Sequence, residues 1–492
     1  MGSYLRHRSY LNLRLILRVI GYLLVIEALF MIIPLIIAMI YKNESFVPFL
    51  ICLGITAGAG GLMMLLKPKT RDMGKREAII LTGFTWVILS LFGMLPFIFY
   101  GTHMSVTDAF FETMSGFTTT GASVLSTLDN VPKSILAWRC VTQWIGGLGI
   151  ILFTLAVVPM LNTSGGMQMF NAEVTGITHD KLRPRVSYTA KGLWGVYAIL
   201  TLLLIVLLSF SKMDFYDAFC YGLSTMSTGG FSTTNFGVHG FESNYVKVVM
   251  TIFMFIGGVN FSLIYNTARG KFKEAMRNTA LRVYLWIILI STVIFSLDIL
   301  IGGKDLTVSN LTINPLFQSV SVLSSTGIIE TDFQLWGPVS EVLLLIMVFI
   351  GACAGSTSGG AKIDRFVVLF KFIRNEFYKM MHPGAVTTVS LNGKGTQAAL
   401  VNKTLAFLFM YILVIIIGGI LLSLMGVDIS EGFYCALMSI SNSGLENGAA
   451  NIDITYATLP DLGKLLLCFI MLVGRLEIFT ILLVFTPSFW KK

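Results

Sequence analysis

The sequence contains few charged residues. Lys, Arg, Asp and Glu together make up 12% of its 492 residues, while hydrophobic residues make up 55% and the mean hydropathy is +0.79. Soluble globular domains carry about 25% charged residues. The shortage of charge therefore excludes a soluble domain of ordinary composition and indicates a membrane protein with many spans.

Histidine and paired cysteine are also scarce. The five histidines fall in loops or at the ends of apolar runs, no HExxH motif occurs, and the six cysteines lie singly without CxxC spacing. These absences argue against a membrane metalloprotease and against a proton relay built from histidines. They favour simple packing roles for the cysteines. We therefore expect neither an enzyme nor a covalently bound cofactor.

The sequence does contain many apolar runs that are long enough to span a membrane. They lie near residues 15–40, 47–66, 78–100, 134–160, 190–211, 245–266, 281–301, 339–373, 401–425 and 463–486. Basic patches such as KPKTRDMGKR (67–76) and RGKFKEAMR (269–277) fall between alternate runs. The positive-inside rule then places both termini in the cytosol.

The net charge of +9 follows from the same basic patches. It is therefore a signal of topology, and we expect no nucleic-acid partner. Most acidic residues fall in the outer segments, where they would attract cations and steer them inward.

Four segments of the chain repeat one pattern, each ending in a hydroxyl-rich or amide-rich turn and a glycine. They read DAFFETMSGFTTTG, DAFCYGLSTMSTGG, NPLFQSVSVLSSTG and EGFYCALMSISNSG, and they end at Gly121, Gly230, Gly327 and Gly444. Each begins with an acidic or amide residue, which suits the first turn of a helix. Each segment is too short to cross a bilayer, so it must enter and return.

Irregular backbone at that depth persists only where it lines a water-filled cavity. Glycine can adopt a positive φ and aim neighbouring carbonyl groups at one axis. Four such turns would form a ring of oxygens that replaces the hydration shell of a cation. The predicted cation-binding residues are Thr119, Thr120, Gly121, Thr228, Gly229, Gly230, Ser325, Thr326, Gly327, Asn442, Ser443 and Gly444.

The repeats predict an all-α polytopic membrane protein with two N-terminal helices and four helix–pore loop–helix units. The N-terminal pair occupies residues 1–70. The units are predicted at 71–180 (unit one), 181–275 (unit two), 276–395 (unit three) and 396–492 (unit four).

The stretch GSTSGGAK (355–362) interrupts the second span of unit three, and the sequence shows no such interruption in the other units. It fails as a phosphate-binding loop because Ala361 separates Gly360 from Lys362 and no Ser or Thr follows. A gate below the turns and a packing kink are both possible interpretations. The residues are Gly355, Ser356, Thr357, Ser358, Gly359, Gly360, Ala361 and Lys362, and Arg475 is the expected partner that holds the loop across the pore.

Charges inside spans are costly and mark functional or paired groups. For Glu27, in the first span, we expect a structural ion pair. Glu477 and Asp298 could titrate, which leaves an ion-coupled (H⁺ or Na⁺) secondary potassium or sodium transporter as the alternative to a channel-like pore.

With its four glycine turns, the chain resembles the Trk/Ktr/HKT superfamily of potassium transporters, and most of all the bacterial Trk-type membrane subunits. The resemblance covers the whole chain. It implies a pseudo-fourfold pore, with Gly121, Gly230, Gly327 and Gly444 in a selectivity filter. It also implies a homodimer in the bacterial cytoplasmic (inner) membrane and a cytosolic regulatory subunit of the TrkA kind that binds a nucleotide (NAD or ATP). Inner loops near 162–189 and 375–397 would dock that subunit.

Four glycines at these positions favour potassium as the transported ion under this resemblance. The turns depart from the TVGYG signature of tetrameric potassium channels. Fewer ordered layers of carbonyl oxygens would follow, so rubidium and sodium are further candidate ions.

Overall fold

The computed structural model describes most of the chain as helix. The described residues are 11–42, 45–68, 73–100, 104–147, 149, 186–235, 237–241, 243–302, 307–329, 336–392, 394–445 and 456–490. Six helices among them are long and apolar enough to cross a membrane, and up to eight spans result if each of two bent helix pairs counts as one. The predicted all-α polytopic membrane fold is confirmed, with one short two-stranded hairpin added.

In the described part of the chain, three helices precede the first repeat and form the N-terminal pair. Its helices are α1 (Leu13–Phe30), which continues into α2 (Ile32–Ile40), and α3 (Phe46–Met64). Gly21 and Gly60 lie face to face where α1 crosses α3, because only glycine lets the two backbones approach so closely there.

Units one and two follow the same order of long helix, half-helix and second helix. Unit one has α4 (Lys75–Gly93), α5 (Leu95–Phe99), α6 (Val106–Phe117) and α7 (Lys133–Gly147). Unit two has α10 (Val186–Ser209), α11 (Phe215–Met226), a 3₁₀ turn η2 (His239–Phe241), α12 (Asn244–Gly257), α13 (Phe261–Ala268) and α14 (Phe272–Arg277).

Units three and four repeat that order. Unit three has α15 (Thr279–Gly302), α16 (Val308–Leu311), α17 (Ile313–Leu323), α18 (Pro338–Ile350), α19 (Ile363–Met381) and the strands β1 (Ser390–Leu391) and β2 (Lys394–Gly395). Unit four has α20 (Ala398–Leu424), α21 (Ile429–Ser441), a 3₁₀ turn η4 (Tyr456–Thr458), α22 (Asp461–Arg475), α23 (Ile478–Val484) and α24 (Pro487–Trp490).

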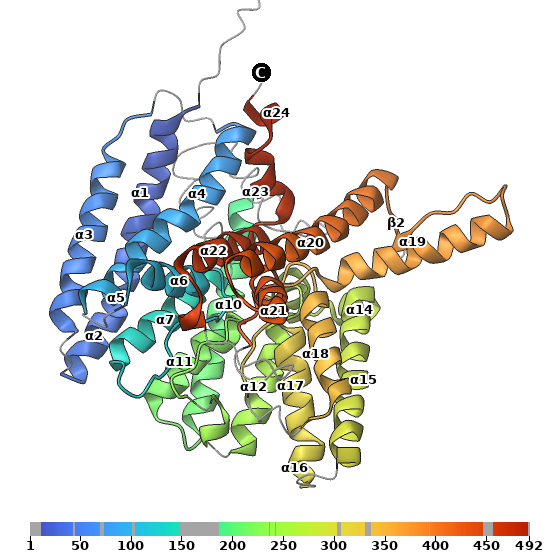
Figure 1. Ribbon diagram of the computed structural model, residues 1–492, viewed down its shortest axis with the longest axis horizontal. Coiled ribbons are helices and arrows are strands. Elements are labelled where there is room, and N and C mark those ends of the chain that lie inside the picture. Colours follow the sequence, from blue (N-terminus) through green and yellow to red (C-terminus); the bar gives the residue numbers. More distant parts are fainter. Residues whose placement is uncertain are drawn as a thin grey trace, which may run out of the picture.

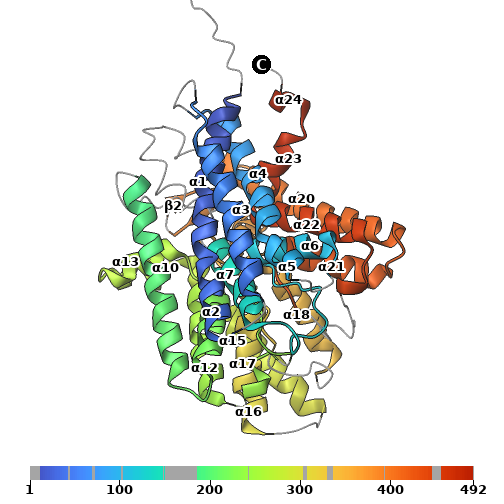
Figure 2. The ribbon, with the colours of Figure 1, turned by 90° about the vertical axis from the view of Figure 1, so that its left-hand side faces the viewer.

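The half-helices α6, α11, α17 and α21 form the centre of the molecule. Each second helix packs against its own half-helix and that of the next unit: α7 lies between α6 and α11, and α12 between α11 and α17. Helix α18 lies between α17 and α21, and α22 closes the circle by packing on α6. The start of α1 and helix α24 lie at one end of the molecule and α16 at the other, while α19 and α20 project sideways (Figure 1, Figure 2).

Candidate functional site

Each half-helix ends in the same kind of turn. An αL residue stands two positions before each glycine: Thr119 (φ 53°), Thr228 (φ 54°), Ser325 (φ 55°) and Asn442 (φ 46°). The next residue donates its amide to a carbonyl five residues back, as Thr120 does to Ser115 at 2.8 Å and Ser443 to Met438 at 3.0 Å. This is the 6→1 hydrogen bond of a Schellman motif.

A positive φ at non-glycine residues is uncommon, and for Thr it carries strain that the surrounding structure must impose. Its repetition at four matching positions therefore marks the turns as a functional candidate. Sequence patterns do not reveal this feature, and from the sequence we expect a positive φ only at the glycines. Gly121 (φ 84°), Gly230 (φ 86°) and Gly327 (φ 72°) do have it. Gly444 is not among the residues with positive φ, so that expectation is wrong for unit four, where Asn442 alone takes the αL conformation.

Each of the four glycines lies against the backbone of another unit, so the four turns form a ring. The backbone of unit two lies against Gly121, that of unit three against Gly230, that of unit four against Gly327 and that of unit one against Gly444. A methyl group built on Gly121 or Gly230 would overlap a carbonyl oxygen of the next unit, and one on Gly327 would lie 3.3 Å from the Gly444 amide nitrogen. The twelve predicted residues of the turns are thus brought together at one centre.

Several polar atoms of these turns are buried without a partner. Among the described residues, the hydroxyls of Thr119 and Ser443 and the side-chain oxygen of Asn442 have no hydrogen-bond partner. Buried polar atoms normally have a partner, so these exceptions need an explanation. The C-terminal ends of the half-helices add partial negative charge at the same place. The arrangement suits a cation.

The acidic and amide residues at the starts of the segments lie in the first turns of the half-helices, as predicted. Two of them also bind a buried lysine of the preceding second helix in the circle. The Lys464 ammonium lies 2.5 Å from Asp108, and that of Lys247 donates to Asn314 at 3.1 Å. These contacts fasten unit four to unit one and unit two to unit three.

The interruption in unit three is longer than the predicted Gly355–Ala361. Helix α18 ends at Ile350 and α19 begins at Ile363, with positive φ at Gly351, Gly355, Gly360 and Lys362. Most of the loop between them is buried. It lies directly beside the turns: the Gly359 amide donates to the Ser325 hydroxyl at 2.6 Å, and the Gly360 amide donates to the Ser441 carbonyl at 2.9 Å.

Arg475 makes the contact that was expected of it. Its guanidinium donates to the Thr357 carbonyl of the loop at 2.8 Å. It also donates to the carbonyls of Gly146 and Gly147 at the end of α7, at 2.5 and 2.8 Å. The amide and hydroxyl of Thr357 both donate to the Gly257 carbonyl at the end of α12, and the Lys362 ammonium donates to the Ser358 carbonyl within the loop. The loop and Arg475 together therefore touch all four units.

Two expectations are wrong, one about breaks in the second helices and one about an ion pair of Glu27. The second helices of two other units are interrupted as well, since α12 and α13 meet at 105° and α22 and α23 at 119°. Asn260 caps α13 and Glu477 adopts φ 65° at these bends, so a short polar break was the missed signal. Glu27 has no ion pair, since both of its carboxyl oxygens lack partners in the described part of the chain.

Glu477 and Asp298, the candidate groups for coupling to a second ion, have structural partners. Glu477 forms an ion pair with Arg365. Asp298 accepts hydrogen bonds from the amide and hydroxyl of Ser340 near the start of α18. All six cysteines are buried free thiols, as the packing interpretation predicted. The inner loop at 162–189 lies almost entirely outside the described residues.

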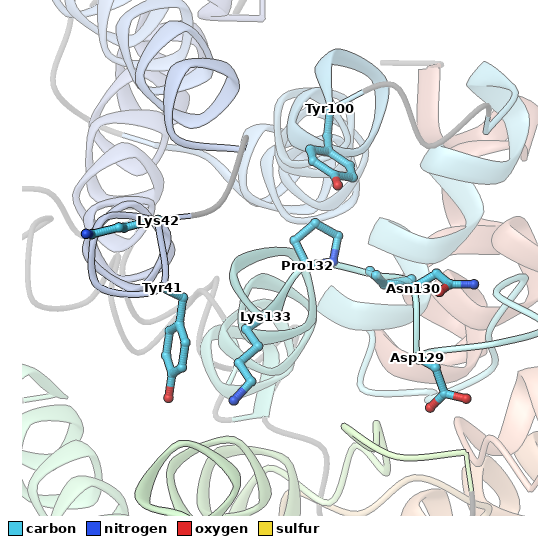
Figure 3. A pocket seen from close by; sticks show the side chains of 8 residues that line it. Tyr41, Lys42, Tyr100, Asp129, Asn130, Pro132 and Lys133 are labelled. Carbon is cyan, nitrogen blue, oxygen red and sulfur yellow. The ribbon is translucent and has the colours of Figure 1, made fainter.

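A cavity of about 420 Å³ lies away from this centre, where the end of α2 meets the start of α7. The Lys133 ammonium lies over the rings of Tyr41 and Tyr216, at 4.3 and 5.0 Å from their centres. Lys42, Lys133 and Asp129 point in different directions, so they do not converge on one ligand (Figure 3). Within the described residues, no group of His, Cys, Asp and Glu side chains could hold a metal ion.

The fold defines an all-α polytopic membrane protein in which four repeated units surround one centre. Comparison with known proteins makes this more specific. The profile of the family described as "TrkH: Cation transport protein" matches residues 49–492, and the chain belongs to this family. The predicted resemblance to Trk-type membrane subunits is thereby confirmed. Membership in a family of transport proteins also confirms that the chain is not an enzyme.

Individual relatives agree over their full lengths. The Trk system potassium uptake protein TrkH of Salmonella typhimurium is 34% identical over 491 residues, covering 98% of this chain and 100% of that protein. The Trk system potassium uptake protein TrkG of Escherichia coli is 33% identical over 492 residues, covering 98% and 99%. The crystal structure of the potassium transporter TrkH from Vibrio parahaemolyticus matches with a TM-score of 0.87 and 31% identity, covering 98% of this chain and 100% of that one.

Proposed function

We propose that this chain carries out potassium uptake across the bacterial cytoplasmic membrane through a channel-like pore. The pore runs through the centre of four units, which we assign to residues 71–180, 181–275, 276–395 and 396–492. The observation that carries the proposal is the closed order in which each glycine turn meets the next. Relatives that match over their whole length and are named Trk system potassium uptake proteins support potassium as the ion.

The selectivity filter consists of the four turns. Carbonyl oxygens and hydroxyls of residues 119–121, 228–230, 325–327 and 442–444 replace the hydration shell of the ion. The unpartnered hydroxyls of Thr119 and Ser443 support this assignment. The strained αL residue in each turn supports it too, because strain of this kind concentrates at functional sites.

The loop that contains residues 355–361 is the gate, with Lys362 and Arg475 as its cationic parts. Its hydrogen bonds to the ends of the half-helices and second helices support a closed position directly below the filter. A loop in that position obstructs the path of an ion, and two cations beside it repel one. Helix α19 follows the loop immediately, so a displacement of α19 would pull the loop aside.

We further propose a homodimer regulated by a cytosolic TrkA-type subunit that binds NAD or ATP. The basic inner segments would dock that subunit, and the projecting α19 and β1–β2 hairpin offer a surface continuous with the gate (Figure 1). Both ends of the described chain lie at one end of the molecule, which supports cytosolic termini. Co-purification with a co-expressed TrkA-type protein, and flux that depends on its nucleotide, test this part.

The pore itself is tested by flux into liposomes that contain only the purified chain. We expect potassium to pass faster than rubidium and sodium, at rates far above about 10³ ions per second, the upper end of ordinary enzyme turnover. A slow potassium flux that requires a proton or sodium gradient would favour the ion-coupled transporter instead. The absence of any potassium flux from correctly folded protein, in the parent and in a variant without the gate loop, would overturn the proposal.

A further inference from the structure

One face of α7 carries two buried polar side chains, four residues apart. Gln143 binds the turn of unit two: its amide nitrogen donates to the Gly229 carbonyl at 2.7 Å, and its oxygen accepts the Phe231 amide at 3.2 Å. Arg139 stands one helical turn earlier on the same face. Its guanidinium lies over the Phe231 ring, 4.1 Å from the ring centre. Helix α7 belongs to unit one, so this face reaches across to unit two.

Arg139 also binds residues of its own unit. Its Nε lies 2.7 Å from Glu112 of α6, and its Nη2 donates to the Ser123 hydroxyl at 2.9 Å. Glu112 in turn accepts the Ser123 hydroxyl at 2.9 Å and the Val124 amide at 2.9 Å. Both charged side chains are almost fully buried, with 2% exposure for Arg139 and none for Glu112. The pair therefore holds the segment that follows Gly121.

The other units lack this arrangement. The residues at the position of Glu112, nine before each glycine, are Tyr221, Gln318 and Cys435. Tyr221 binds the segment after its own glycine through Ser232 and the Gly237 carbonyl. Gln318 is fully buried, and in the described residues its amide has no partner.

The second helices differ in the same way. Aligned on Gly146, Gly257 and Gly474, which each meet the end of their own half-helix, the positions of Arg139 and Gln143 hold Met250 and Met254 in α12 and Leu467 and Met471 in α22. Those side chains can pack but cannot donate to a carbonyl. Among these three helices, the charged brace formed by Glu112 and Arg139 therefore occurs only at α7, in the joint between units one and two.

We propose that the buried Glu112–Arg139 pair is a positioning element that sets the ion selectivity of the pore. The pair binds the segment after Gly121 in unit one and stacks on the segment after Gly230 in unit two. It therefore fixes the separation of two of the four turns in the ring. Potassium and sodium differ in radius by a fraction of an ångström, so a ring held at the spacing of one ion coordinates the other less well. This inference rests on the proposed filter.

Stability and selectivity are expected to separate in variants of this pair. Replacing a buried ion pair by apolar side chains of similar volume is often neutral or stabilising, whereas removing one partner leaves an unpaired charge. The double variant Glu112→Leu/Arg139→Met therefore leaves no unpaired charge, although the Ser123 hydroxyl and the Val124 amide lose Glu112 as their acceptor. The single variant Glu112→Gln keeps an acceptor for Arg139 and loses one for the Val124 amide or the Ser123 hydroxyl.

The experiment measures potassium, rubidium and sodium permeability of these variants in liposomes, together with thermal stability. The double variant should keep the parent's melting temperature within a few degrees. Its potassium-to-sodium permeability ratio should fall roughly tenfold, because the preference for potassium weakens by about the free energy of one hydrogen bond. Glu112→Gln should fall between the parent and the double variant.

Trp138→Phe is the matched control. Trp138 is buried on the same helix but donates to the Gly93 carbonyl of α4, so its loss should not change selectivity. A folded double variant with the parent's permeability ratio would overturn the inference. A variant Gly121→Ala that also leaves the ratio unchanged would show that the filter assignment itself has failed, whereas a changed ratio in Gly121→Ala alone would limit the failure to the brace.

Discussion

Arg475→Ala should open the pore. The guanidinium holds the loop through the Thr357 carbonyl and anchors itself on the Gly146 and Gly147 carbonyls of α7. Truncation at Cβ removes all three contacts and the positive charge. The remaining contacts of the closed loop, such as the Gly359 amide to Ser325 and the Gly360 amide to Ser441, stay in place. The variant therefore weakens the closed state without destroying it.

The size of the effect follows from the single bond that joins Arg475 to the loop. A hydrogen bond to a charged group contributes about 1.5–3 kcal/mol. A loss of about 2 kcal/mol raises the ratio of open to closed loop roughly 30-fold, because each 1.4 kcal/mol is a factor of ten. The Arg475→Ala protein should then conduct potassium roughly 30-fold faster than the parent, under conditions in which the closed loop predominates in both proteins.

The assay is potassium flux into liposomes at matched amounts of folded protein, with and without the regulatory subunit. Arg475→Lys keeps the charge with fewer donors and should lie between the parent and the alanine variant. Deletion of residues 355–361 should give the fastest flux and the weakest response to the regulator. If both the alanine variant and the deletion fold and conduct no faster than the parent, the loop is a packing kink and the gate lies elsewhere.

Two further predictions concern stability. Gly60→Ala should lower the melting temperature, because its methyl group would lie 2.9 Å from both the Gly21 carbonyl oxygen and the Val25 side chain. Gly58→Ala on the same helix is the control and should leave the melting temperature unchanged, because its methyl group meets nothing within 4 Å. Equal melting temperatures for the two variants would contradict the close approach of α1 and α3. Lys464→Met should also lower the melting temperature by leaving the Asp108 carboxylate without its cation, and Asp108→Asn in the same protein should restore part of the loss. No rescue would show that the lysine acts through packing alone.

Much of the fold could be predicted because it depends on local patterns. Span length, the basic patches and the four glycine turns each occupy a short stretch of sequence, and together they predict the all-α polytopic membrane fold. The contact between Arg475 and the loop could be expected because an unwound loop in a membrane needs a donor, and Arg475 was the one arginine at a similar depth in the next unit.

The rest depends on contacts between distant residues. Nothing near Glu112 indicates that Arg139 will bind it, and Glu27 looked equally suited to an ion pair that it does not form. The αL conformation of Thr119 and Thr228 is imposed by the turn and opposes the preference of the residue, so propensity pointed the wrong way. The bend between α22 and α23 was missed because one strained residue, Glu477, suffices to make it.

The central claim is that the four glycine turns select the ion. The most direct test is the potassium-to-sodium permeability ratio of the purified chain in liposomes, compared with that of Gly230→Ala. Gly230 has φ 86°, and a methyl group there would overlap the Thr326 carbonyl oxygen of the next unit. The account predicts a ratio well above one for the parent and a ratio close to one, or a loss of flux, for the folded variant. A folded variant with the parent's flux and ratio would contradict it.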